Sequence, residues 1–69
     1  MEIKWEDGFK ISVHADGNIA TISANKAGLL SLAQQLTALA EHDGRDHYHL
    51  DEHNSLEDGS SELIIEKID

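Results

Sequence analysis

The sequence predicts an α+β fold, a mainly antiparallel five-stranded sheet with one helix packed on one face. Three observations predict it: an apolar–polar alternation in the first 24 residues, a helical periodicity through the middle, and a second alternation toward the end. The expected element order is β-β-β-α-β-β. With 69 residues, the chain is expected to form a single small domain spanning 1–69.

A first short strand is expected from Ile3 to Trp5. A three-residue loop, Glu6-Asp7-Gly8, would place Trp5 opposite Phe9 and Ile3 opposite Ile11. Gly8 then stands where the loop needs a left-handed residue. A two-residue turn would instead invert the faces, so the longer loop is predicted.

Two further strands are expected between residues 9 and 24. Phe9, Ile11 and Val13 alternate with polar neighbours, which is typical of a half-buried strand. Asp16-Gly17 is a favoured two-residue hairpin turn. A turn centred there pairs Ala15 with Asn18, Val13 with Ala20 and Ile11 with Ile22 on one face, and Ser12 with Thr21 and His14 with Ile19 on the other.

A helix is expected from about Lys26 to Glu41. Asn25 is a plausible N-cap, and Gly44 is a stop signal. The expected buried stripe recurs at helical spacing and comprises Leu29, Leu32, Ala33, Leu36, Leu39 and Ala40. The side opposite to it would carry Ser31, Gln34, Gln35 and Ala38.

The last third predicts two more strands. Tyr48 and Leu50 alternate with His47, His49 and Asp51, and "SELIIEKI" follows a polar connection and Gly59. In the final strand Leu63 and Ile65 point one way, and Ile64 and Ile68 the other. The second pair either forms an exposed apolar patch that suits a dimer or partner contact, or reflects modest exposure on a central strand.

Charge is the strongest compositional signal. Fourteen acids oppose five bases, and residues 41–69 alone hold ten acids against Arg45 and Lys67, a net of −8. This balance argues against nucleic acid or an anionic membrane as partner, because phosphate contacts need Lys and Arg. It favours a basic protein partner, or else serves only solubility. Without a visible signal peptide or membrane span, the expected location is the cytoplasm.

The segment "HYHLDEHN" raises the question of a metal site. On a strand, His47, His49 and Asp51 share one face, but three such positions span roughly 13 Å, too far for a single ion. A complete site would need His53 or His14, which the predicted register places on the same open face. The sequence therefore predicts neither a metal nor a cofactor. The alternative is a small homodimeric module that binds metal through histidines on the open face of the sheet. Catalysis is not favoured, because no serine elbow, glycine-rich phosphate loop or cysteine nucleophile is present.

Two stretches, "ISANKAGLLSLAQQLTALA" and "HYHLDEHNSLEDGSSELIIEKI", resemble a group of very small bacterial immunity proteins of polymorphic toxin systems, type thirty-two. The likeness runs from about residue 18 to residue 68. It implies an antitoxin that binds and blocks a cognate toxin in the cytoplasm without chemistry of its own. A basic nuclease would fit as the toxin. The substrate of a nuclease is anionic, so an acidic inhibitor can mimic it. The candidate partner-binding residues are His47, His49, Asp51, Glu52 and Glu57.

Overall fold

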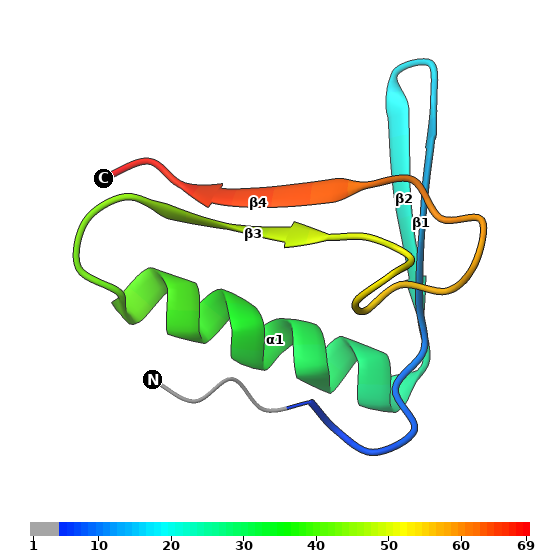
Figure 1. Ribbon diagram of the computed structural model, residues 1–69, viewed down its shortest axis with the longest axis horizontal. Coiled ribbons are helices and arrows are strands. Elements are labelled where there is room, and N and C mark those ends of the chain that lie inside the picture. Colours follow the sequence, from blue (N-terminus) through cyan, green and yellow to red (C-terminus); the bar gives the residue numbers. More distant parts are fainter. Residues whose placement is uncertain (1–4) are drawn as a thin grey trace.

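A computed structural model describes residues 5–69 of the chain. The helix and strands follow one another as β1 (Ile11–Asp16), β2 (Ile19–Ala24), α1 (Lys26–Glu41), β3 (Asp46–Leu50) and β4 (Leu63–Lys67). In Figure 1, β3 and β4 run along the length of α1, whereas the β1–β2 hairpin stands steeply across the end of the helix and projects beyond it.

The described strands form two separate antiparallel pairs, β1–β2 and β3–β4. The α+β class is confirmed, but the expected five-stranded sheet is wrong. The reason lies at the free edge of β1, which the connection between β3 and β4 occupies. Glu57 N donates to Ile11 O at 2.8 Å, and Ser61 N donates to Val13 O at 2.7 Å. Because this irregular segment uses the backbone groups of β1, no regular strand adds there.

The expected first strand is not formed at Trp5, and Ile3 lies outside the described residues. The loop before β1 differs from the expected three-residue form: Phe9 N donates to Glu6 O at 3.2 Å, which closes a turn centred on Asp7 and Gly8, and Gly8 has a φ of 75°. Trp5 and Phe9 stack, with ring centroids 4.8 Å apart. The two aromatic residues thus meet as predicted, through ring contact and not through strand pairing.

The β1–β2 turn is centred on Gly17-Asn18, one position later than expected. Val13 pairs with Ile22, and Ile11 pairs with Ala24, so the predicted partners are wrong by two residues. Gly17 has a φ of 60°. A glycine with positive φ at the first central position is typical of a type II′ turn, which fits the right-handed strand twist. Because a shift of two preserves strand parity, each side chain keeps its predicted face.

Helix α1 has the predicted bounds and the predicted cap. The side chain of Asn25 accepts hydrogen bonds from Gly28 N at 2.7 Å and from Lys10 N at 3.0 Å, and its amide donates to Gly8 O at 3.0 Å. One side chain thereby satisfies a free helix donor and joins the helix start to the loop before β1.

The buried side of α1 differs from the prediction by roughly a quarter of a turn, at 3.6 residues per turn. Its buried residues are Gly28, Ser31, Leu32, Gln35 and Leu39, whereas Leu29, Ala33, Leu36 and Ala40 are exposed. A Cβ at Gly28 would stand 2.4 Å from Lys10 O, so the missing side chain permits a close approach to the chain entering β1. Ser31 tolerates burial because its hydroxyl accepts from Glu6 N and donates to Ala27 O, both at 2.8 Å.

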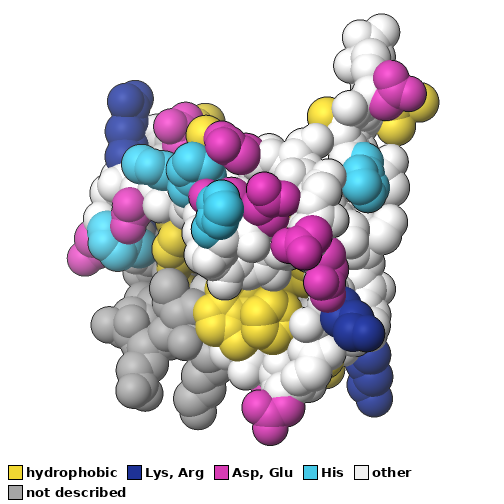
Figure 2. Space-filling model, turned by 45° about the vertical axis from the view of Figure 1, so that its right-hand side comes forward, with side chains coloured by type: hydrophobic (Ala, Val, Ile, Leu, Met, Phe, Trp, Pro, Cys, Tyr) yellow, Lys and Arg dark blue, Asp and Glu magenta, His cyan; other side chains and the backbone are white. Residues whose placement is uncertain are grey.

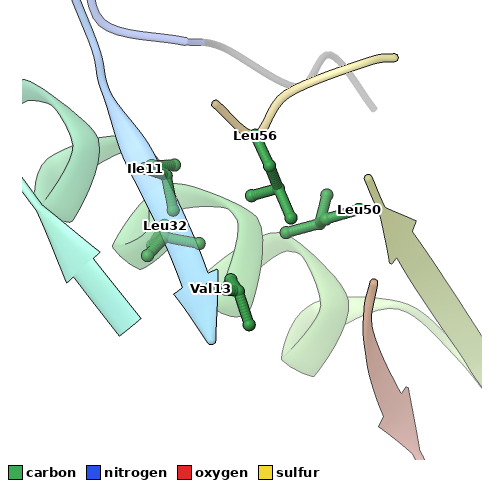
Figure 3. Packing of buried hydrophobic residues seen from close by; sticks show 5 residues of the cluster. All are labelled: Ile11, Val13, Leu32, Leu50 and Leu56. Atoms are coloured by element: carbon green, nitrogen blue, oxygen red, sulfur yellow. The ribbon is translucent and has the colours of Figure 1, made fainter. Parts of the chain in front are cut away.

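The core lies between β1, α1 and the second strand pair (Figure 3). Its buried cluster consists of Ile11, Val13, Leu32, Leu50 and Leu56. Leu63 and Ile65 pack against the cluster, whereas Ile64 is 59% and Ile68 is 73% exposed. The predicted division of the final strand into two faces is therefore confirmed.

Candidate partner-binding face

His47 and His49 lie on the outward side of the β3–β4 pair. Both are exposed, while the intervening Tyr48 is partly covered and Leu50 is buried. In the antiparallel register His47 is opposite Glu66, and His49 is opposite Ile64. His49 Nε2 also lies 3.2 Å from Glu62 Oε2. The outward face therefore combines imidazoles, carboxylates and one exposed isoleucine.

Asp51 organises the loop that follows β3. Its backbone oxygen accepts from Asn54 N, Ser55 N and Leu56 N, and its carboxylate accepts from His53 N at 2.9 Å. A side chain that bonds its own backbone two residues on forms a local turn. Among the candidate residues, Asp51 thus has a structural task that the sequence pattern alone did not reveal.

Glu52 and Glu57 lie in the same connection. Glu52 Oε2 accepts from Gly59 N at 2.9 Å, which joins the two ends of the connection. Glu57 is bound to β1 through its backbone, while its side chain is exposed. The five predicted residues therefore divide into two histidines on a strand face and three acids on the adjoining loop.

Figure 2 shows histidine and acidic side chains gathered across one face of the molecule. We call the exposed His, Asp and Glu side chains of residues 47–66 the acidic face; they are His47, His49, Glu52, His53, Glu57, Asp58, Glu62 and Glu66. Glu62 and Glu66 are additions to the candidates. Their signal was present in the sequence, because both share strand parity with Ile64.

A hollow of about 340 Å³ opens beside the two histidines. Its lining includes Trp5, Tyr48 and His49, together with Gln35 from the buried side of α1. Its volume falls at the small end of the range for ligand pockets. Aromatic faces next to an acidic surface can receive the side chain of an arginine or lysine by cation–π contact.

The structure separates the histidines that a metal site would have to combine. His14 lies on β1, in a different sheet from His47 and His49, so the expected common open face is wrong. Among residues 5–69, no three His, Cys, Asp or Glu side chains are grouped to hold an ion. No helix in this part of the chain has the length and apolarity to cross a membrane.

The chain belongs to a family of immunity proteins. Residues 20–68 match the model of the family described as Immunity protein 32, and this match covers all but the first residue of β2, together with α1, β3, β4 and the whole acidic face. No curated protein matches the chain. No solved structure matches it either. Immunity protein families are generally non-enzymatic.

Proposed function

We propose that the protein neutralises a cognate bacterial toxin in the cytoplasm by binding it through the acidic face. The observation that carries the proposal is the position of this face within the segment that matches the immunity family. Residues 41–69 have a net charge of −8, and the exposed residues Glu66 and Glu62 lie opposite His47 and beside His49. Such a surface accelerates the approach of a basic partner and disfavours anionic ones.

A toxin that acts on nucleic acid fits this surface best. Enzymes that bind phosphate backbones carry Lys and Arg in their substrate sites. Carboxylates on the acidic face would occupy those sites in place of phosphates. The hollow beside Tyr48 would receive one cationic side chain at the centre of the contact, while Glu57 and Glu66 bind at its rim.

The partner is to be sought in the reading frame next to the gene. The protein encoded there should kill cells when it is expressed alone. Co-expression of the immunity protein should restore their growth. Association should slow steeply between low and physiological salt, because the attraction is screened. A rate that does not change with salt, at unchanged affinity, would remove the electrostatic part of the proposal.

Charge-reversal variants locate the contact. Glu57 and Glu66 have exposed side chains, so Lys at both positions should leave the fold intact and weaken toxin binding by at least tenfold. Asp16→Lys combined with Asp7→Lys is the matched control, with the same change in net charge at exposed residues outside the acidic face. Equal losses in both double variants would show that only net charge matters.

A further inference from the structure

The exposed flank of α1 is an apolar surface that includes Leu29 and Leu36, two residues expected in the core. Leu29 is 57%, Leu30 is 44% and Leu36 is 47% exposed. Ala33 and Ala40 are exposed as well. The core side of the helix is already filled by Leu32 and Leu39, so this flank has no function in the interior. Contiguous exposed apolar residues on a soluble domain are typical of an interaction site.

The spacing of this flank is that of a helix-pairing seam. Leu29, Ala33, Leu36 and Ala40 follow one another by four, three and four residues, as a and d positions do. Large and small side chains alternate along the seam. No charged residue lies between Ala27 and Ala40, while Lys26 precedes this stretch and Glu41 and Asp43 follow it.

We propose that α1 pairs antiparallel with α1 of a second copy, about a twofold axis between Gln34 and Gln35. In this pairing Leu29 meets the partner's Ala40, and Leu36 meets the partner's Ala33. Each leucine thus packs over an alanine, which lets the two helices approach closely. Symmetry makes every contact twice, because the interface is isologous.

The charges at the two helix ends favour the antiparallel direction. The same pairing places Lys26, the first residue of α1, near the partner's Glu41, the last residue of α1. A parallel pair would instead place Lys26 against Lys26 and leucine against leucine, with the alanines leaving gaps. Opposite charges at both ends also fix the register, since sliding by one turn would break both contacts.

A second copy suits this flank better than the toxin does. Two chains that each carry −9 repel one another when their acidic faces meet. The helix is where they can approach without facing carboxylates. A basic toxin would find no acid between Ala27 and Ala40 to bind. Pairing through α1 leaves both acidic faces open, so the dimer would hold two binding sites.

The test is the mass of the protein in solution, measured by sedimentation over a wide concentration range. We expect two chains per particle at high concentration and dissociation on dilution. Leu36→Asp should raise the dissociation constant at least tenfold, because the change enters the interface twice. Ile19→Asp is the matched control: it puts the same charge on a residue that is 69% exposed in the β1–β2 hairpin, and it should change the constant less than twofold.

A charge exchange tests the register. Lys26→Asp should weaken the dimer, and adding Glu41→Lys to that variant should restore it, while the double variant keeps the net charge of the original chain. Failure of the double variant to recover would overturn the antiparallel register. A particle of one chain at every concentration would overturn dimerisation. If, in addition, Leu36→Asp abolished toxin binding, the flank would belong to the toxin.

Discussion

Two consecutive regions of this chain differ sharply in charge. Residues 17–40, which form β2 and α1, contain one charged residue, Lys26, whereas residues 41–69 contain ten acids and two bases. The first region exposes Ile22, Leu29 and Leu36; the second exposes carboxylates and imidazoles. The two regions therefore suit different partners. The acidic region attracts basic proteins and repels the acidic region of a second copy, whereas residues 17–40, here called the uncharged region despite Lys26, do neither.

The two regions also differ in how they use polar groups. In the uncharged region Asn25 and Ser31 connect the helix to the chain before β1. In the acidic region Asp51 and Asn54 hydrogen-bond within their own loop, where Asn54 Oδ1 accepts from Asp51 N at 3.1 Å. Substitutions of Asn25 or Ser31 should therefore disturb the whole fold. Outward substitutions in the second should leave it stable.

Ile11→Ala removes the side chain on which both regions depend. Ile11 is 0% exposed and packs in the core. Its backbone oxygen accepts a hydrogen bond from Glu57 N. The free energy of unfolding should fall by about 2–5 kcal/mol. For a chain of this length that loss is a large share of the total. Urea unfolding measures it, with Ile19→Ala as the exposed control; equal losses in the two variants would contradict the described core.

Gly28→Ala sets two opposing effects on stability against each other: a higher helix propensity and a clash between α1 and the chain entering β1. Alanine favours helix by about 1 kcal/mol over glycine. The new Cβ would meet Lys10 O at 2.4 Å and Ile11 Cγ1 at 3.0 Å, so one element must shift. We expect a net loss of roughly 1–3 kcal/mol in unfolding free energy, because overpacking outweighs propensity. A gain in melting temperature would mean that α1 does not approach β1 this closely.

Asn25→Ala should cost about 1–2 kcal/mol, since it removes the cap and the acceptor for Lys10 N. Asn25→Asp is the informative companion. It keeps both accepted bonds and loses only the donor to Gly8 O. Its stability should lie between those of the original chain and the alanine variant. If both variants lost the same amount, the donated bond would be the important one.

His49→Ala should have the smallest effect on stability, below about 0.5 kcal/mol. Its contact with Glu62 Oε2 is 3.2 Å long but exposed, and exposed ion pairs contribute little. Toxin affinity should fall clearly, as measured by calorimetry. His14→Ala on β1 is the control that should preserve both properties. A large loss of stability in His49→Ala would assign this residue to the fold and not to the acidic face.

Much of the local structure could be predicted from the sequence. The bounds of α1 follow from the cap at Asn25 and from the helical periodicity that continues to Ala40. The two sides of β4 follow from strand parity, which also brings Glu62 and Glu66 beside the histidines. The structural task of Asp51 could not be predicted in the same way. It depends on loop hydrogen bonds whose partners the pattern does not specify.

The sequence by itself determined the separation of charge and the ends of the helix, because both depend on residues that are neighbours along the chain. Only the tertiary structure decided which flank of α1 is buried and how the strands are grouped. Leu29 and Leu36 form one apolar stripe and Leu32 and Leu39 another, so periodicity permits either. The close approach at Gly28 selects the second stripe, and the segment from Glu57 to Ser61 occupies the edge of β1 that a larger sheet would need.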